Sequence, residues 1–246
     1  MTNPPLAIRR SSVRPAAFTL LEILLVVALA GILAALLLPA LGKMKSSGNR
    51  LKCLANLRQI GTAFSQYAAD HDGWVVKARD YSGWVEGPDG GWPESWVSHL
   101  SAYLTDGQKY GGTPETTARA FRCPEGKDAE WNATSYLANI FLGGFRDPEL
   151  GVRPELPDFY NPRKLANCLQ PSKCVIVADG NPVTQGFLEF EIWNKEALGQ
   201  LEPRHDGTAN LLFADGHVEN CRPGLLTPDQ VVEMFTWNGL EWWPAP

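Results

Sequence analysis

The stretch FTLLEILLVVALAGILAALLLPAL, residues 18–41, decides the fold class of the N-terminal part of this chain. It contains 24 residues and a single charged side chain, that of Glu22. As an α-helix it is about 36 Å long, which is sufficient to cross the roughly 30 Å hydrocarbon core of a bilayer. We therefore expect one transmembrane helix over residues 18–41.

Two general alternatives are an uncleaved signal anchor and a plain transmembrane helix. Glu22 argues against both, because a charge at mid-membrane costs about 2.5–3.5 kcal/mol and normally has a partner. An ordinary secretory signal has a shorter apolar stretch of about 7–15 residues. The basic residues do not assign an orientation, since three precede the stretch and four follow closely.

The residues around the start of the apolar stretch, RPAAFTLLE at 14–22, resemble the type IV prepilin processing signal. Pilins and the pseudopilins of type II secretion share this signal. The resemblance implies that a prepilin peptidase removes residues 1–17 by cutting between Ala17 and Phe18, and that Phe18 is then N-methylated. Ala17 departs from the glycine that usually precedes the cut in this family.

The same resemblance implies roles for two residues inside the apolar helix. Glu22 becomes the fifth mature residue, the position that carries a glutamate in this family, and is expected to act in assembly. Pro39 stands where many of these proteins have a helix-kinking proline. The resemblance also implies a single pass through the inner (cytoplasmic) membrane, with the leader inside and the head outside. The expected partners are the peptidase/methyltransferase, other pilin subunits and the membrane.

Beyond the apolar stretch, residues 42–70 are expected to prolong the helix. Apolar residues there recur at a spacing of three to four: Leu51, Leu54, Leu57, Ile60, Phe64 and Tyr67. This spacing predicts an amphipathic helix whose apolar stripe packs on the head. The sequence His71-Asp-Gly73 predicts its end.

The head is expected to cover residues 71–246. Apolar runs predict strands at 175–178 and 187–193. A short helix is predicted within 96–104, and a capping box from Thr227 to Gln230 predicts another near the C-terminus. Together these elements predict an α+β, pilin-like fold, with a long N-terminal helix packed on a small antiparallel sheet.

Charge is divided unevenly along the chain. The formal net charge is -5, yet residues 1–58 carry about +7 and residues 59–246 about -12. An acidic head repels phosphate backbones, so no nucleic-acid partner is expected.

The five cysteines, Cys53, Cys123, Cys168, Cys174 and Cys221, lack zinc-type spacing. Export would permit disulfides. We expect at least one, either Cys53 with Cys123 in a long loop or Cys168 with Cys174 in a short one. The odd count leaves at least one thiol outside any bridge within the chain.

The most distinctive stretch of the head runs from Arg204 to Val218. Asp215-Gly216 between apolar runs predicts a hairpin with positive φ at both turn residues. That register places Ala214 opposite His217 and Phe213 opposite Val218. Val218 would then share the buried face of the preceding strand, with His217 on the other face.

Nine residues separate His205 from Asp215-Gly216, which resembles the H-x9-D-G signature of a large group of prepilin-type proteins. Three further stretches fit that group: 53–60 (CLANLRQI), 121–124 (FRCP) and Ser135-Tyr136. The resemblance therefore covers nearly the whole chain, but it implies architecture rather than an activity.

We expect no cofactor and no metal site in the head. His205, Asp215 and His217 are the candidate ligands if a metal does bind, since imidazole and carboxylate suit divalent ions. Pseudopilins of this superfamily often hold calcium in a head loop, but no segment here matches that loop. Signatures such as G-x-S-x-G and H-E-x-x-H are absent from the sequence, and we expect no enzymatic activity.

The expected function is structural: a subunit of a type II secretion pseudopilus or a type IV pilus-like filament, in the periplasm or at the cell surface. The alternative is a membrane-tethered binding module for a glycan or surface polymer that uses the prepilin leader only for export.

Overall fold

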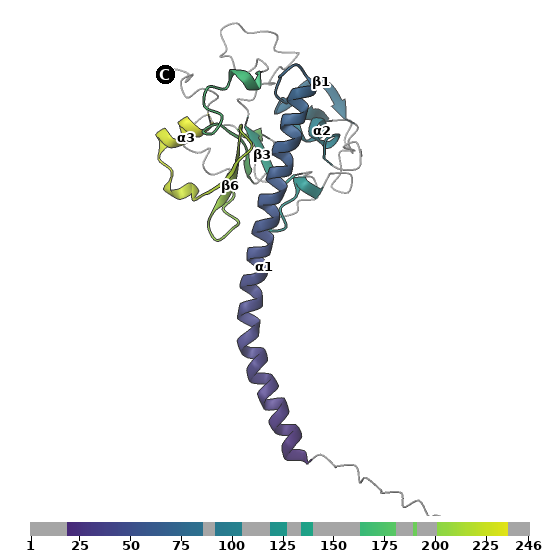
Figure 1. Ribbon diagram of the computed structural model, residues 1–246, viewed down its shortest axis with the longest axis vertical. Coiled ribbons are helices and arrows are strands. Elements are labelled where there is room, and N and C mark those ends of the chain that lie inside the picture. The colour runs from purple at the N-terminus through teal and green to yellow at the C-terminus, as the bar shows by residue number, and fades with distance from the viewer. Residues whose placement is uncertain are drawn as a thin grey trace, which may run out of the picture. The chain divides into compact units, whose positions relative to one another are not determined.

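The structure is a computed structural model. It describes residues 19–85, 92–104, 119–126, 134–139, 163–180, 189–190 and 201–235. Two compact units are present, Met1–Lys45 and Ser46–Pro246. A long helix, α1 (Leu20–Asp70), contributes to both units (Figure 1).

The start of α1 is fixed by a capping box, in which a side chain at each end of the first turn bonds the backbone of the other. The backbone N–H of Thr19 donates to Oε2 of Glu22 at 2.8 Å, and the Thr19 hydroxyl donates to the same oxygen at 3.0 Å. The backbone N–H of Glu22 donates in turn to the Thr19 hydroxyl at 3.3 Å. Glu22 therefore stabilises the N-terminus of its own helix.

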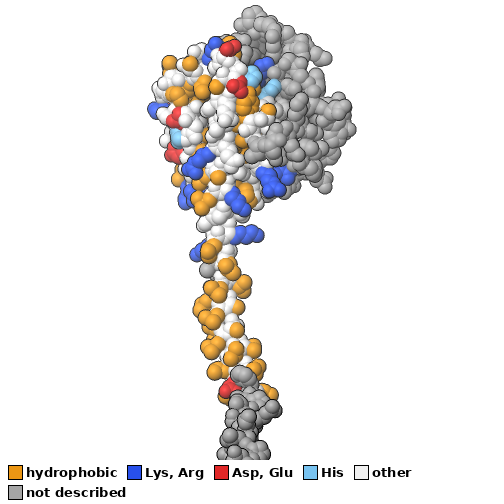
Figure 2. Space-filling model, turned by 45° about the vertical axis from the view of Figure 1, so that its right-hand side comes forward, with side chains coloured by type: hydrophobic (Ala, Val, Ile, Leu, Met, Phe, Trp, Pro, Cys, Tyr) orange, Lys and Arg blue, Asp and Glu red, His pale blue; other side chains and the backbone are white. Residues whose placement is uncertain are grey.

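In the N-terminal unit, α1 presents apolar side chains on all sides. The large apolar residues from Leu20 to Leu41 are between 52% and 85% exposed. Figure 2 shows them along the visible face of this stretch. By length and composition the helix is able to span a membrane. Exposure of this many apolar residues is unfavourable in water and favourable in a bilayer.

Within the second unit, one face of α1 is buried. Its fully buried residues include Cys53, Leu57, Ile60 and Phe64, at the expected spacing of three to four. The predicted stripe is wrong at its start, because Leu51 is 66% exposed. Counting back from Leu57 in steps of four reaches Cys53 on the buried face, whereas Leu51 lies on another side of the helix.

The helix ends at Asp70, as the sequence predicts. Asp72 and Gly73 both have positive φ, of 52° and 82°. The backbone N–H of Gly73 donates to the carbonyl oxygen of Ala68 at 2.7 Å and so satisfies a helix-terminal acceptor.

A five-stranded sheet forms the centre of the head, with the strand order β5-β3-β4-β6-β7. Only β3 and β5 run parallel, and the other neighbours are antiparallel. The predicted strand at 187–193 appears as β5, and its remaining residues lie outside the described part. The bounds are β3 Tyr136–Asn139, β4 Val175–Asp179, β5 Glu189–Phe190, β6 Ala209–Phe213 and β7 Val218–Cys221.

Shorter elements surround this sheet. A second, two-stranded sheet pairs β1 with β2, and α2 follows it directly within the predicted range 96–104. The capping box at Thr227 is present, with the Gln230 N–H donating to the Thr227 hydroxyl at 3.3 Å. The bounds are β1 Arg79–Val85, β2 Trp92–Ser95, α2 Trp96–Ser101, η2 Arg119–Phe121, η5 Leu165–Asn167, η8 Pro223–Leu225 and α3 Pro228–Phe235.

The strands β3, β4 and β6 of the central sheet are buried on both faces. Leu212 of β6 packs in one apolar cluster with Leu57, Ile60 and Phe64 of α1. Leu211 and Phe213 pack in a second cluster with Phe235 of α3. The described head therefore has an α+β layout of three layers, with α1 and α3 on opposite faces of the sheet.

The β6–β7 hairpin is present but its predicted register is wrong. Leu212, not Phe213, lies opposite Val218. The turn is closed by a hydrogen bond from the Gly216 N–H to the Phe213 carbonyl oxygen at 2.9 Å. The central residues of this turn are Ala214 and Asp215, and Gly216 at its last position has positive φ, of 88°. This pattern is typical of a three-residue loop, which shifts the pairing by one residue.

The shift reverses the predicted faces. Val218 packs with the cluster that contains Leu212, and the ring of His217 stacks on Phe213 with centroids 4.2 Å apart. A turn with positive φ at both residues does occur nearby, at Asp206 (54°) and Gly207 (79°).

Candidate functional site

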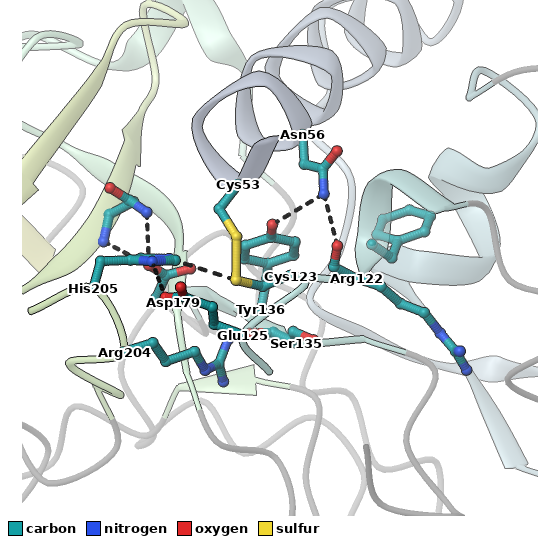
Figure 3. The surroundings of a disulfide bond; sticks show 12 residues. Cys53, Asn56, Arg122, Cys123, Glu125, Ser135, Tyr136, Asp179, Arg204 and His205 are labelled. Atoms are coloured by element: carbon teal, nitrogen blue, oxygen red, sulfur yellow. Dashed lines mark hydrogen bonds and ion pairs between the residues drawn. A yellow bond between two sulfur atoms is a disulfide. The ribbon is translucent and has the colours of Figure 1, made fainter. Parts of the chain in front are cut away.

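The polar centre of the head is a group of five side chains that we call the disulfide–histidine cluster: Cys53, Cys123, Glu125, Asp179 and His205. Cys53 and Cys123 form a disulfide between α1 and the segment after η2. Cys53, Cys123, Asp179 and His205 are each at most 3% exposed. The cluster is therefore a buried junction between segments far apart in the sequence (Figure 3).

His205 is held in place by a tight two-residue turn. His205 and Thr208 exchange backbone hydrogen bonds of 3.1 Å in both directions. Asp206 and Gly207 supply the two positive φ values that this type of turn requires. The turn leads directly into β6, an internal strand, and so fixes the imidazole beside the start of that strand.

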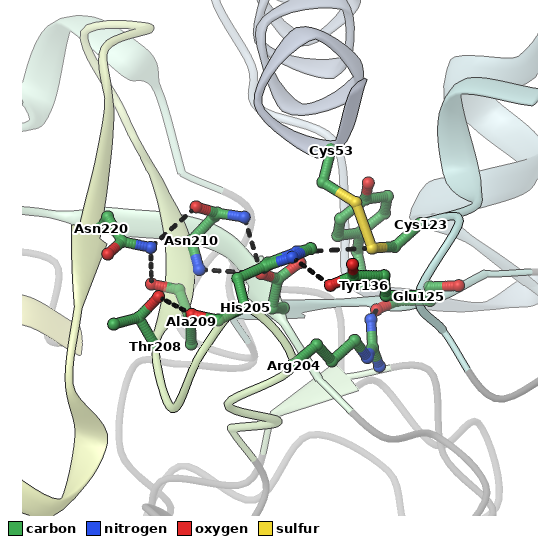
Figure 4. Close-up of polar contacts among 12 residues, drawn as sticks. Cys53, Cys123, Glu125, Tyr136, Arg204, His205, Thr208, Ala209, Asn210 and Asn220 are labelled. Carbon is green, nitrogen blue, oxygen red and sulfur yellow. Dashed lines mark hydrogen bonds and ion pairs between the residues drawn. A yellow bond between two sulfur atoms is a disulfide. The ribbon is translucent and has the colours of Figure 1, made fainter. Parts of the chain in front are cut away.

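Both ring nitrogens of His205 face polar partners (Figure 4). Nδ1 lies 2.7 Å from Oε2 of Glu125, at ion-pair distance but without hydrogen-bond alignment. Nε2 lies 3.4 Å from Sγ of Cys123 and 3.5 Å from Oδ2 of Asp179. The ring thus connects the disulfide to two carboxylates.

Asp179 is the last residue of β4 and is fully buried. Its Oδ2 accepts hydrogen bonds from the backbone N–H of Asn210 at 2.8 Å and from the Asn210 side-chain amide at 2.9 Å. Oδ1 has no hydrogen-bond partner among the described residues. Burial raises the pKa of Asp179 to about 6, against the opposing effects of the Asn210 hydrogen bonds, Arg204 and His205.

Arg204 reinforces the same junction. Its guanidinium donates to the carbonyl oxygen of Ser135 at 2.7 Å and also to that of Gly180. Burial lowers the pKa of Arg204, and the nearby Asp179 carboxylate opposes this shift. Arg204 therefore places a positive charge beside Asp179 and ties His205 to the strands β3 and β4.

On the other side of the disulfide, Asn56 bonds two further segments. Its side-chain amide donates to the carbonyl oxygen of Arg122 at 2.7 Å and to the Tyr136 hydroxyl at 3.4 Å. Tyr136 is fully buried, and burial raises the pKa of its hydroxyl. Asn56 follows Cys53 by three residues, so one face of α1 provides both contacts.

Three of the stretches that carry the resemblance meet at this junction, together with His205 of the fourth. Residues 53–60 provide Cys53 and Asn56, and residues 121–124 provide Cys123. The backbone N–H of Ser135 donates to the Phe121 carbonyl oxygen at 2.8 Å. The motif histidine lies against the disulfide. Among the described residues, these stretches connect α1, the loop after η2 and the central sheet.

We compared the chain with protein-family models, with curated proteins and with solved structures. None of the three comparisons finds a match.

The other two candidate metal ligands lie apart from His205. Asp215 and His217 pair with each other across the β6–β7 turn, with Nδ1 of His217 2.5 Å from Oδ1 of Asp215. Both side chains are exposed. Among the described residues, the potential metal donors that lie together are Cys53, Cys123 and His205, all within 4.8 Å of one another. The expected trio of His205, Asp215 and His217 is not brought together.

The second candidate cysteine pair, Cys168 and Cys174, is not bridged in the structure. Both residues are buried and their thiols are hydrogen-bonded to each other. That bond lowers the pKa of Cys168, and it acts with burial to raise that of Cys174. Cys221 on β7 is half-buried, and burial raises the pKa of its thiol to about 11.

Two of the four N-terminal candidates, Ala17 and Phe18, lie outside the described residues. Glu22 caps α1, as described above, and α1 continues through residue 39, the position of Pro39. The structure thus adds a local role for Glu22 that the sequence analysis did not include.

A basic hollow of about 410 Å³ lies beside the disulfide. Its charged lining residues are Lys52, Arg119 and Arg122, and Asn56 also contributes. These three cations lie together although the head as a whole has more acidic than basic residues.

The sequence assigned no role to Arg204 and Asn210, which lie in the distinctive stretch 204–218, and did not single out Glu125 and Asp179. Asp179 had a usable signal, since a carboxylate directly follows the apolar run 175–178. Arg204 and Glu125 directly flank singled-out motifs, but nothing in their spacing predicts which segments they contact. Asn210 follows the His205 turn and has no distinguishing pattern.

Proposed function

We propose that this chain is a structural subunit of a type II secretion pseudopilus or a type IV pilus-like filament. In this proposal α1 anchors the chain in the inner membrane, prepilin peptidase removes residues 1–17, and the head lies outside the cytoplasm. The observation that carries the proposal is the helix 20–41, whose apolar side chains are exposed on all sides around the single charge of Glu22. A helix of this kind suits both a bilayer and a bundle of identical helices.

Three features of the head support this proposal. His205, Cys53 and Cys123 are buried in one scaffold, as expected when a head serves as a rigid building block, whereas Asp215 and Gly216 form the β6–β7 turn. The Cys53–Cys123 disulfide suits an oxidising compartment outside the cytoplasm. The helix–sheet packing of 46–70 places α1 in the head core, so the membrane segment and the head share one continuous helix.

The second candidate function is a membrane-tethered binding module. The basic hollow at Lys52, Arg119 and Arg122 favours it, because three cations around one cavity suit an anionic polymer. In that case the chain uses the leader and helix only for export and attachment.

Mechanical shearing of cells that make the protein separates these functions. A filament subunit is released as polymers, and mass spectrometry of the released chain gives an N-methylated Phe18 start. A tethered module stays in the membrane fraction as a monomer after shearing. A chain that keeps residues 1–17 would argue against both processing and assembly.

A further inference from the structure

We propose that the disulfide–histidine cluster is also a tetrahedral zinc site, which forms when the Cys53–Cys123 bond is reduced. The ligands are the two thiolates, Nε2 of His205 and the carboxylate of Asp179. This inference does not depend on the filament function, because every group involved lies within the unit Ser46–Pro246.

The donor separations fit this metal. With Zn–S of about 2.3 Å and Zn–N of about 2.0–2.1 Å, tetrahedral zinc requires a sulfur–nitrogen separation of about 3.5 Å. The corresponding nitrogen–oxygen separation is about 3.3 Å. In the structure, Nε2 lies 3.4 Å from Sγ of Cys123 and 3.5 Å from Oδ2 of Asp179. The Cys53 sulfur is bonded to that of Cys123 and lies within 4.8 Å of a ring nitrogen of His205.

The surroundings of His205 also suit a metal ligand. Histidines that bind zinc usually direct the second ring nitrogen at a carboxylate, which fixes the ring and raises its basicity. Nδ1 of His205 lies 2.7 Å from the Glu125 carboxylate, and Nε2 lies near Cys123 and Asp179 (Figure 3).

Charge and hydrogen bonding support the same set. Asn210 already donates twice to Oδ2 of Asp179, but Oδ1 is buried without a hydrogen-bond partner among the described residues, so the carboxylate has acceptor capacity left for a cation. Two thiolates, one carboxylate and Zn²⁺ carry a net charge of about -1, by the usual charges of metal-bound groups. The nearby Arg204 guanidinium balances that charge.

Reduction precedes metal binding. A dithiol breaks the Cys53–Cys123 bond by thiol–disulfide exchange, supplying two electrons and becoming a disulfide itself. Each protein sulfur takes up one proton. Zn²⁺ then displaces both protons to solvent as the thiolates bind. The disulfide and the metal site use the same two sulfur atoms, so the chain has one or the other but not both.

Cobalt(II) is a suitable probe, because thiolate-bound tetrahedral cobalt absorbs strongly in the near ultraviolet and visible. The full chain, in detergent and without dissolved oxygen, is reduced with a water-soluble phosphine. The disulfide oxidises the phosphine to its oxide, while water supplies the oxygen atom of the oxide and the two protons taken up by the sulfurs. We expect one cobalt per chain with a two-thiolate spectrum, bleached by one equivalent of zinc. The oxidised chain should give no such spectrum.

Variants assign the ligands. Cys53→Ser and His205→Ala should remove the spectrum, whereas His217→Ala, at an exposed histidine outside the cluster, should not change it. Glu125→Gln should weaken zinc binding by roughly 10–100-fold, as expected for a residue that orients a ligand. Circular dichroism checks that each reduced variant is folded. If His205→Ala does not fold, the effect of Glu125→Gln on zinc affinity tests the role of His205 instead. The proposal is overturned if reduced wild type gives no thiolate–cobalt spectrum. It is equally overturned if the two-thiolate spectrum survives Cys53→Ser, which would place the metal on other cysteines.

Discussion

Nε2 of His205 lies 3.4 Å from Sγ of Cys123, so the motif histidine of the head contacts the disulfide that ties the head to α1. The turn at 206–207 orients the ring, and β6 begins directly after it. Through this contact, residues separated by 82 positions in the sequence meet in the core. The scaffold that supports the C-terminal half of α1 is built around this pair.

Loss of the Cys53–Cys123 bridge should destabilise the head. The two residues are separated by 70 positions, and closing such a loop reduces the entropy of the unfolded chain by an amount equivalent to about 4 kcal/mol. Cys53→Ser should therefore lower the free energy of unfolding by about 2–5 kcal/mol, measured by urea denaturation of the chain in detergent.

Cys221→Ser is the matched control, because Cys221 forms no disulfide. It should change stability much less than Cys53→Ser does. Peptide mapping without reduction should find the 53–123 bridge and no 168–174 bridge. Equal stability of the two serine variants would show that the bridge does not stabilise the head.

In the two Asp-Gly turns, substitution of the glycines with positive φ should lower the stability of the head. Gly207 and Gly216 have φ of 79° and 88°, and a Cβ at either would meet no atom within 4 Å. Each Gly→Ala change should therefore cost about 1–2 kcal/mol through backbone strain alone. Thermal unfolding of the variants measures this.

Gly224 is the control for the turn variants, since a Cβ there also meets nothing and its φ is not positive. Gly224→Ala should be close to neutral. Asp215→Ala should cost less than Gly216→Ala, because Asp215 does not have positive φ and loses only its contacts with His217. A larger loss for Asp215 than for Gly216 would contradict the three-residue turn.

Burial of Asp179 makes the stability of the head depend on pH. Its folded pKa is raised to about 6 from an ordinary value of 3.8. Between these values the folded chain keeps a proton that the unfolded chain has lost, so stability falls as pH rises. The loss amounts to roughly 3 kcal/mol and levels off above the folded pKa.

Asp179→Asn should remove this dependence while its amide oxygen still accepts the two hydrogen bonds from Asn210. The measurement is the free energy of unfolding in urea at several pH values from 4 to 7, for wild type and variant. The difference between the two curves isolates Asp179 from other titrating groups. Parallel curves would mean that Asp179 is not titrating in this range.

The sequence predicts the elements well where a local pattern decides the structure. The end of α1 at Asp70 and the Thr227 capping box follow from a few adjacent residues. The hairpin register does not, because Asp-Gly fits both a two-residue and a three-residue turn. Sequence spacing likewise left two cysteine pairings open, and tertiary packing is needed to bring Cys53 to Cys123.

The contacts within the candidate site are even harder to predict from sequence, because they form only through tertiary packing. His205 is visible as part of a motif, but its contacts with Glu125 and Asp179 join segments 26 or more residues apart. Leu51 shows the same limit on a smaller scale. It continues the apolar spacing, yet the head begins to cover α1 on the face of Cys53 instead.

The central claim, that the chain assembles into a filament, is tested most directly at Glu22. After cleavage, the Phe18 amine of an incoming subunit is expected to pair with Glu22 of its neighbour, which would offset the cost of a charge among apolar helices. Glu22 also caps its own helix through Thr19, so the test must separate these two roles.

The measurement compares sheared fractions and cross-linked ladders from cells that make wild type, Glu22→Val or Thr19→Ala. Thr19→Ala disrupts the capping box but leaves the carboxylate, so it should still assemble. Glu22→Val should insert into the membrane and lose its leader normally, yet give no ladder and no sheared polymer. Wild-type assembly by Glu22→Val would contradict the filament account and favour a membrane-tethered binding module.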